Sequence, residues 1–412
     1  MTYRHRVATV FLFGFFLDLI NMFIASIAFP AISRALAVSV SQLAWVSNAY
    51  ILGLTVVVPF SAWLSERWGA KRLFLLSLGL FSLGALAAGL ANSLSELILW
   101  RTLQGMGGGL LIPLGQALTW PLFQPHERAK LSAAVMLVGL LAPACSPAIG
   151  GLLAPACSPA IGGLLVEAFS WRWVFFASLP VALLTFVLAV RWLNDTPGPV
   201  RPTRFLPLSL LADPLLRFAM LIYLCVPGMF IGVNVVGMYY LQRVTGMAPG
   251  AIGALMVPWS LASFAAITFT GRYFNRFGPR PLVVIGCLLQ AMGIMLLLKI
   301  DADSPLALLI LAFTLMGGGG SLCSSTAQSS AFLHTPAEEM PDASALWNLN
   351  RQLSFFAGSA LLALLLRVFP PAYAWQGVFI SAAVITLLPL LFCLRLNNRA
   401  IIHRLHTTLE KS

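Results

Sequence analysis

Long apolar stretches alternate with short polar segments along almost the whole chain, and this pattern predicts membrane-spanning helices. About 20 consecutive apolar residues cross a bilayer core as a helix, and stretches of that length recur from end to end. The ten-residue alternating segments typical of membrane β-barrels are absent. The pattern predicts an all-α, polytopic membrane protein with twelve transmembrane helices, at 8–33, 43–63, 73–93, 97–122, 131–167, 173–193, 217–242, 249–271, 281–300, 305–329, 343–368 and 374–395.

The polar segment from 194 to 214 separates these predicted helices into two sets of six. Five prolines interrupt it, so it cannot cross a bilayer as a helix. The second helix is followed by ERWGAKR (66–72), and the equivalent eighth helix is followed by NRFGPRP (275–281). This repetition predicts two pseudo-symmetric six-helix bundles. The predicted domains are an N-terminal bundle at 1–193, a cytoplasmic linker at 194–214, a C-terminal bundle at 215–396 and a cytoplasmic tail at 397–412.

Composition and charge support this class. The chain is 59% hydrophobic and only 9% charged, whereas soluble domains carry about 25% charged residues. Its net charge of +12 comes from Lys and Arg that gather in alternate loops, which is an orientation signal and not a nucleic-acid patch. We therefore expect both termini to be cytoplasmic.

The positions of the cysteine, histidine and glycine residues are typical of helix packing, and they predict no cofactor site. The six cysteines lie within apolar helices without a CxxC pair, which is typical of reduced packing residues. The five histidines are scattered without metal-ligand spacing, so we expect no metal. The glycine runs at 107–109 and 317–320 follow no strand, and they favour close helix packing over phosphate binding.

Several segments, taken in order, carry a family resemblance. They resemble the major facilitator superfamily along nearly the whole chain, and within it the EmrB/QacA type of drug:proton antiporter. The usual members of that branch have fourteen helices, whereas twelve are predicted here. The segments are LDLINMFIASIAFPAI (17–32), AWLSERWGAKR (62–72), LILWRTLQGMGGG (97–109), the repeated SPAIGG, YLQRVTGMAPGAIGALMVP (240–258) and NLNRQLSFFAG (348–358).

The resemblance implies roles for individual residues. Its first-helix pattern places the family's membrane carboxylate at Asp18, and its fourth-helix pattern places an intramembrane arginine at Arg101. The loop motif G-x-L-a-D-R-x-G-r-k departs here at Ala62, Glu66 and Ala70, so we expect a retained but altered loop lock. The predicted lock residues are Glu66, Arg67, Gly69, Lys71 and, in the second half, Arg276.

The resemblance also extends to the predicted fifth helix. SPAIGG is similar to the antiporter motif G-P-x-x-G-G, with serine in place of the first glycine, and in such antiporters this stretch is held to favour export and limit leak. Two copies fit the motif. The residues are Pro147, Gly150 and Gly151 in one copy and Pro159, Gly162 and Gly163 in the other.

Three ionisable residues lie deep in the predicted helices: Asp18, Arg101 and Arg351. A charge at that depth costs on the order of 3 kcal/mol or more, so such residues normally line cavities or pair. Asp18 lies about 15 Å along its helix, a depth that the long Arg101 side chain can also reach. We hypothesise that Asp18 binds and releases the coupling proton with Arg101 as its partner; the alternative is a static ion pair between helices 1 and 4.

The second half has no Asp or Glu at a depth comparable to that of Arg351. The Arg351 guanidinium is therefore expected to donate hydrogen bonds either to amides and backbone carbonyls or to the substrate. One acidic residue, Asp18, and two basic residues, Arg101 and Arg351, lie at this depth. This balance of charge argues against a dicationic substrate and favours a neutral or anionic one. Aromatic faces, however, also bind lipophilic cations. We expect the substrate cavity to include Asn21, Trp45, Tyr50, Gln104, Asn234, Tyr239, Gln328, Trp347 and Arg351.

A twelve-residue segment, LLAPACSPAIGG, occurs twice in succession at 140–163 without a single difference. One copy suits a kinked helix with a small-residue surface. With both copies, a helix over 131–167 would be about 55 Å long, against a bilayer core of roughly 30 Å. We interpret the repeat as a tandem duplication, and we expect one copy to be extruded at the helix end or the chain to break at Gly150 and Gly151.

Deleting residues 152–163 is therefore expected to leave folding and transport intact or improved, because it restores a helix of ordinary membrane length. Expression level and the elution profile of the detergent-purified protein measure the effect on folding. A collapse of expression would show instead that the second copy has a structural role.

Taken together, the residues and the resemblance predict a proton-coupled exporter of small molecules, with multidrug efflux as the first choice. A dedicated exporter of an anionic metabolite, such as a carboxylate siderophore or organic acid, is the alternative; an uptake symporter or a transporter-shaped receptor ranks lower, and an enzyme lower still. We expect a monomer in the bacterial inner membrane that binds its substrate, protons and lipid, and neither cofactor nor nucleic acid.

Overall fold

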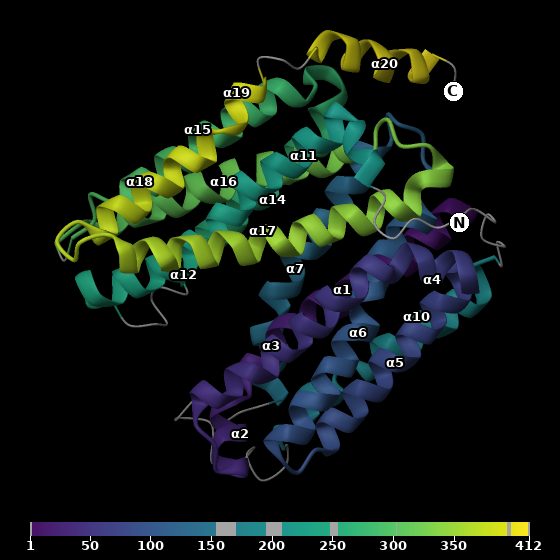
Figure 1. The fold of residues 1–412 in the computed structure, drawn as a ribbon, viewed down its shortest axis with the longest axis horizontal. Helices are drawn as coiled ribbons and strands as arrows, with labels where there is room; N and C mark the ends of the chain where they lie inside the picture. The colour runs from purple at the N-terminus through teal and green to yellow at the C-terminus, as the bar shows by residue number, and fades with distance from the viewer. Residues whose placement is uncertain are drawn as a thin grey trace. The chain divides into compact units, whose positions relative to one another are not determined.

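The computed structural model describes residues 2–153, 170–194, 208–247, 254–301, 303–393 and 397–410, and every regular element within them is a helix (Figure 1). The predicted all-α class is confirmed. The α-helices are α1 (Tyr3–Ile27), α2 (Phe29–Leu36), α3 (Val40–Val57), α4 (Ser61–Trp68), α5 (Ala70–Leu90), α6 (Leu94–Thr119), α7 (Arg128–Leu153), α9 (Trp173–Phe176), α10 (Leu179–Trp192), α11 (Pro214–Cys225), α12 (Pro227–Val244), α14 (Met256–Phe277), α15 (Pro279–Leu297), α16 (Leu306–Ala331), α17 (Met340–Val368), α18 (Ala374–Leu387), α19 (Pro389–Cys393) and α20 (Asn398–Glu410).

Nine helical stretches within the described residues are long and apolar enough to cross a membrane. They include α5, α15 and α16, and a stretch from Pro214 to Arg243 that joins α11 to α12. The chain is thus built as a polytopic membrane protein. The predicted fifth span reaches into 154–169, which lies outside the described residues together with one copy of the antiporter motif.

Polar caps define where two central helices begin. The Ser39 side chain accepts a hydrogen bond from the Gln42 amide, and the Gln42 side chain accepts one from the Ser39 amide at 2.9 Å, which forms a capping box at the start of α3. The Ser93 hydroxyl accepts from the Glu96 amide at the start of α6. These caps satisfy amides that a helix leaves unpaired and so set where α3 and α6 begin.

The two repeated loop motifs form similar tight turns. Gly69 joins α4 to α5 with φ of 82°, and Gly278 joins α14 to α15 with φ of 71°. Both values lie in the region that glycine adopts readily and other residues avoid. The equivalence that the sequence suggested between 66–72 and 275–281 therefore extends to the backbone conformation of the turn.

Contacts divide the chain into two compact units. The first comprises Met1–Phe123, Val138–Pro207 and Pro336–Leu349, and the second comprises Gln124–Leu137, Leu208–Thr335 and Asn350–Ser412. Two long helices, α7 and α17, contribute residues to both units. Residues 195–207, most of the predicted linker, lie outside the described residues.

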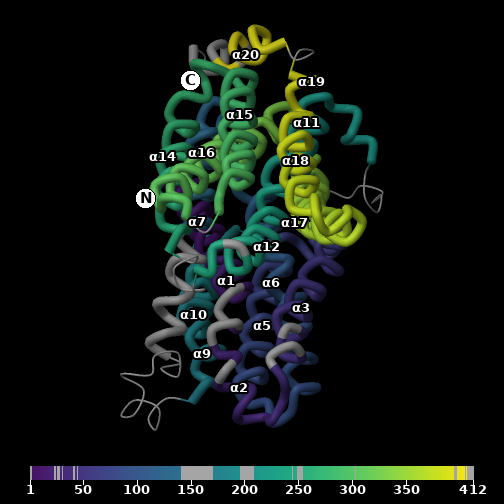
Figure 2. The backbone as a smooth tube through the Cα atoms, turned by 90° about the vertical axis from the view of Figure 1, so that its left-hand side faces the viewer, coloured from purple at the N-terminus to yellow at the C-terminus, as the bar shows by residue number. Residues whose placement is uncertain are grey.

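The first unit is built around α6. Helices α1, α3 and α5 pack directly against it, and α10 packs against α1 and α5, as the tube in Figure 2 also shows. Its core buries Leu17, Tyr50, Phe74, Phe81 and Leu111. Because α6 is central, its polar side chains are enclosed on several sides.

The second unit is built around α16, against which α11, α14 and α15 pack. Its core buries Val233, Phe313, Met316, Leu362 and Phe379. Cys225, Cys287, Cys323 and Cys393 of this unit are buried and free, as expected for packing residues.

Candidate functional site

Asp18 lies on α1 at the centre of the first unit and is completely buried. One turn further along the same helix, Asn21 is equally buried, and its side-chain amide donates to the Leu17 carbonyl at 3.0 Å. A buried carboxyl group requires polar company, because its desolvation is costly. That company comes from α3 and α6.

Tyr50 on α3 provides the first partner of Asp18. Its hydroxyl donates to Asp18 Oδ1 at 2.5 Å and also lies 3.4 Å from the Asp18 carbonyl oxygen. The Tyr50 ring is itself fully buried. The hydrogen bond therefore fixes the orientation of the carboxyl group from a helix 32 residues further along the chain.

Arg101 on α6 is fully buried and engages three groups around Asp18. Its Nη2 donates to the Asn21 carbonyl at 2.8 Å, and its Nη1 donates to Gln104 Oε1 at 2.8 Å. Its Cζ lies 4.4 Å from the centre of the Tyr50 ring, within the range of a cation–π contact. Arg101 is thus held against the residue that also binds the Asp18 carboxyl.

Gln104 closes this arrangement, since its Nε2 donates to Asn21 Oδ1 at 3.0 Å. The structure therefore joins Asp18, Asn21, Tyr50, Arg101 and Gln104 into one buried network from three helices. The sequence predicted Asp18 and Arg101 as partners, and it assigned the other three to the substrate cavity. We call these five residues the Asp18 network.

Chemically, the network couples an acid to a fixed cation through a neutral hydroxyl and an aromatic ring. Charged and hydrogen-bonded groups interact strongly where water is excluded. Gaining or losing a proton at Asp18 changes the charge that faces Tyr50 and Arg101, so the hydrogen bonds and the packing of α1, α3 and α6 are tied to its protonation state.

Glycines allow α3 and α6 to approach closely enough to build this network. A Cβ on Gly105 would overlap the Tyr50 carbonyl oxygen, and a Cβ on Gly108 would overlap the Tyr50 hydroxyl and lie 2.6 Å from Asp18 Oδ1. The prediction that the glycine run at 107–109 serves helix packing is confirmed, because a Cβ on Gly107 would lie 2.5 Å from the backbone nitrogen of Phe81.

Replacing Gly105 by Ala is expected to destabilise the protein by about 1–3 kcal/mol and to impair transport, because the new methyl group meets backbone and forces α3 away from α6. Gly79→Ala is the matched control: a Cβ there has nothing within 4 Å, and alanine favours the helix. Thermal unfolding of the two purified variants measures the difference. Equal midpoints would show that the close approach at Gly105 is unimportant.

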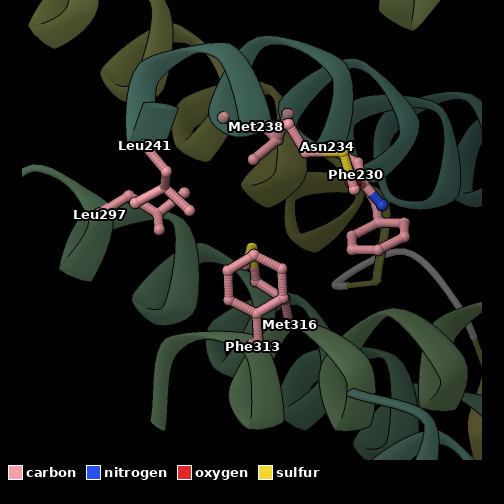
Figure 3. Close-up of a pocket in the computed structure, with 9 residues that line it drawn as sticks. Phe230, Asn234, Met238, Leu241, Leu297, Phe313 and Met316 are labelled. Carbon is pink, nitrogen blue, oxygen red and sulfur yellow. The ribbon is translucent and has the colours of Figure 1, made fainter. Parts of the chain in front are cut away.

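A small apolar pocket lies in the second unit between α12, α15 and α16 (Figure 3). The pocket is small, with a cavity volume of about 10 Å³, and one amide, that of Asn234, is the only polar side chain that lines it. The Asn234 Nδ2 lies 3.8 Å from Met256 Sδ. The other lining residues are Phe230, Val233, Gly237, Met238, Leu241, Leu297, Phe313 and Met316. Aromatic rings and flexible methionines suit apolar and aromatic solutes of varied shape.

The remaining predicted cavity residues are distributed differently. Trp45 and Tyr239 are 60% and 45% exposed, and the Tyr239 ring lies 4.8 Å from the Arg243 guanidinium and 6.0 Å from Trp375. Trp347 is buried in the first unit, whereas Gln328 and Arg351 are buried in the second.

The loop-lock residues lie at the two glycine turns. Arg67 is exposed with its guanidinium 5.7 Å from the Trp63 ring, and Arg276 is exposed with its guanidinium 5.6 Å from the Phe277 ring. Glu66 and Lys71 are partly buried on either side of Gly69. Their interaction as a lock stays a prediction.

Of the antiporter motif, Pro147, Gly150 and Gly151 belong to the backbone of α7. Pro159, Gly162 and Gly163 lie outside the described residues. Helix α7 continues through Gly150 and Gly151 to Leu153, so the expected alternative of a chain break at these glycines is wrong. Extrusion of one copy at the helix end is still a prediction.

Comparison with known proteins identifies the family. The Major Facilitator Superfamily matches the chain over residues 11–353, with a second match over 219–405. The chain belongs to the major facilitator superfamily. This confirms the resemblance, and it makes the protein a membrane transporter of a small molecule and not an enzyme.

Relatives of this major facilitator protein include proteins named for drug resistance. The putative multidrug resistance protein MdtD of Salmonella paratyphi B is 27% identical over 450 aligned positions, covering 93% of each chain. A multidrug resistance protein B homolog of Mycobacterium tuberculosis is 26% identical over 385, covering 78% of this chain and 69% of the relative. The fold also matches that of FucP, a fucose:proton symporter of E. coli, in its outward conformation. The TM-score is 0.75 at 14% identity, and the match covers 96% of this chain and 99% of FucP.

Sequence reasoning missed several polar contacts of this major facilitator protein. In the second unit, Arg128 Nη1 donates to the Phe332 carbonyl at 2.5 Å, and the Asn275 side chain donates to the His126 carbonyl at 2.6 Å. Arg128 is one of the Lys and Arg residues in the loops that together form the predicted orientation signal. These contacts join residues 204 and 149 positions apart, so no local spacing in the sequence could have revealed them.

A second missed pair lies in the first unit. Asn348 Nδ2 donates to Gln116 Oε1 at 2.6 Å, and it also donates to the Ser344 carbonyl at 2.8 Å. Gln116 is completely buried in α6. A glutamine within an apolar helix was the signal that the sequence offered, since buried amides are seldom without a hydrogen-bonding role.

Proposed function

We propose that this transporter exports small molecules in exchange for protons by alternating access, and that it acts as a multidrug efflux protein. The observation that carries the proposal is the Asp18 network: a buried carboxyl group hydrogen-bonded to Tyr50 and tied through it to Arg101. Intramembrane ionisable residues that are enclosed and partnered in this way commonly serve proton relays.

Proton exchange at Asp18 supplies the coupling. When Asp18 takes up a proton, the negative charge that opposes Arg101 is lost, and the balance of contacts among α1, α3 and α6 changes. If proton and solute bind in alternation to a transporter whose facing states differ in affinity for this proton, a pH gradient drives the solute in the direction opposite to the protons.

The choice of multidrug efflux rests on two further observations. Relatives at 26–27% identity are named multidrug resistance proteins. The pocket between α12, α15 and α16 is lined by Phe and Met side chains with one amide, and such a lining tolerates apolar and aromatic solutes of different shapes. We propose it as the site for the apolar part of the substrate.

Transport into inside-out vesicles under an imposed pH gradient, acidic inside, tests the proposal. We expect tetraphenylphosphonium, a lipophilic aromatic cation, to accumulate above the level in vesicles without the protein, and a protonophore to abolish that accumulation. Transport unaffected by the gradient would contradict proton coupling.

Export of an anionic metabolite is the second candidate function, and the buried Arg351 favours it. Arg351 is 7% exposed, and the sequence of the second half has no Asp or Glu at a comparable predicted depth in the membrane. Citrate in the same vesicle assay distinguishes the two functions. Accumulation of citrate in place of tetraphenylphosphonium would support the anion exporter.

Replacing Phe313 by Ala is expected to raise the KM for tetraphenylphosphonium about tenfold, because a buried ring contact contributes on the order of 1 kcal/mol beyond its area. Leu311→Ala, on the exposed side of the same helix, is the matched control and should leave KM unchanged. If both variants shift KM equally, or neither does, the pocket does not bind this solute.

A further inference from the structure

The end of α14 next to the Gly278 turn carries three aromatic side chains in a row. Phe269, Tyr273 and Phe277 follow one another at intervals of four residues; the first two ring centres lie 4.8 Å apart, and the last two lie 6.0 Å apart. Phe269 and Phe277 are exposed. On the predicted topology, this row marks the cytoplasmic edge of the bilayer, where aromatic residues concentrate.

Arginines accompany the aromatic row. The guanidinium of Arg272 lies 5.7 Å from the Tyr273 ring, and that of Arg276 lies 5.6 Å from the Phe277 ring. Both arginines are exposed. Arg272 stands five residues before the end of α14, about 7.5 Å along the helix axis, so its long side chain can extend toward the headgroup level.

Asn398 holds the start of α20, which carries Arg399, next to the Gly278 turn. Its Nδ2 donates to the Phe277 carbonyl at 2.8 Å, and its Oδ1 accepts from the Arg280 amide at 3.2 Å, so it fastens the start of α20 to the turn. Leu405 and Ile401 pack against the cluster around Phe274 and Leu282. The adjoining Arg399 remains exposed at the first turn of α20.

The sequence of α14 and α15 contains basic residues and no acidic ones. No Asp or Glu occurs between Asp213 and Asp301, a stretch that contains all of α14 and α15. We define the α14 patch as Arg272, Arg276, Arg280 and Arg399 with the aromatic row beside them. Its positive charge complements an anion, and its aromatic rings complement the region between lipid headgroups and acyl chains.

We propose that the α14 patch binds an anionic phospholipid of the cytoplasmic leaflet, with the arginines on the phosphodiester headgroup and the aromatic row against the upper acyl chains. A soluble anion would use the charge alone, whereas the exposed rings extend the site into the bilayer. The proposal is independent of the transported solute and of the proton-coupling role of Asp18.

Native mass spectrometry of the detergent-purified full chain tests it, with titration of phosphatidylglycerol and of phosphatidylcholine bearing the same acyl chains. Each basic residue near an anionic surface contributes about fivefold in affinity. We expect phosphatidylglycerol to bind at least about fivefold more tightly than phosphatidylcholine. The double variant Arg272→Gln, Arg276→Gln should reduce this preference by at least about fivefold, while its affinity for phosphatidylcholine stays unchanged.

Arg243→Gln is the matched control, because Arg243 likewise stands over a tyrosine, at 4.8 Å from the Tyr239 ring, but at the opposite predicted membrane surface. It should keep the preference. Equal affinity of the unmodified protein for the two lipids would overturn the proposal without any variant. Equal loss in the Arg243 variant, or displacement of phosphatidylglycerol by millimolar inorganic phosphate, would overturn it as well.

Discussion

Replacing Asp18 by Asn is expected to reduce pH-gradient-driven uptake of tetraphenylphosphonium into inside-out vesicles to the level of vesicles without the protein. Asn has the size of Asp and can still accept the Tyr50 hydrogen bond, so the packing of α1 against α3 should persist. It cannot take up or release a proton at the relevant pH, however, and the gradient then has no group on which to act.

Exchange of labelled for unlabelled solute at equal concentrations serves as the control for this variant. Such exchange needs alternating access but no net proton movement, so the Asp18→Asn protein should retain it. Gradient-driven uptake at the unmodified rate would contradict the coupling role of Asp18. Loss of both activities, with the protein still folded, would favour the static ion pair as its role.

Replacing Arg101 by Lys is expected to lower both stability and gradient-driven uptake. Lys keeps the charge but loses the planar fork that reaches the Asn21 carbonyl and Gln104 Oε1 together. A buried polar group left without its partner costs about 1–3 kcal/mol. We expect uptake to fall at least about tenfold, which corresponds to 1.4 kcal/mol.

Arg172→Lys is the matched control for Arg101. Arg172 makes a similar fork, with Nη1 donating to the Gly89 and Ala91 carbonyls at 2.8 Å and Nη2 donating to Asn92 at 3.0 Å, but near the surface. Its replacement removes comparable hydrogen bonds away from Asp18, so it should lower the thermal midpoint with little effect on uptake. Equal loss of uptake in both variants would show that Arg101 acts through stability alone.

The class of fold and the two central ionisable residues were accessible from the sequence for a clear physical reason. A bilayer demands long apolar helices, and it makes each charge within them costly, so Asp18 and Arg101 stand out by scarcity alone. The equivalence of the loops at Gly69 and Gly278 could likewise be predicted from the sequence, because only glycine adopts those backbone angles easily.

The role of Tyr50 was not accessible in the same way. Helix α3 is apolar on most of its circumference, so its sequence does not indicate which face turns toward α1 and α6. For the same reason, Trp45 was expected in the cavity but is 60% exposed on that helix, while Tyr50 is enclosed. Helix rotation is decided by packing, here by glycines that admit the Tyr50 backbone next to α6.

The pocket illustrates a further limit of sequence reasoning. Asn234 was expected in the substrate cavity, and it lines the pocket. Phe313 and Met316 give no comparable signal, because apolar residues are ordinary in a membrane helix and only the packing of α12, α15 and α16 brings them together.

Proton movement driven by the solute tests the central claim most directly. Proteoliposomes that contain a pH-sensitive dye are given an outward or inward gradient of tetraphenylphosphonium without any initial pH gradient. We predict that the unmodified protein moves protons opposite to the solute and that the Asp18→Asn protein moves solute without protons. Solute-driven proton movement that persists in the Asp18→Asn protein would contradict this prediction.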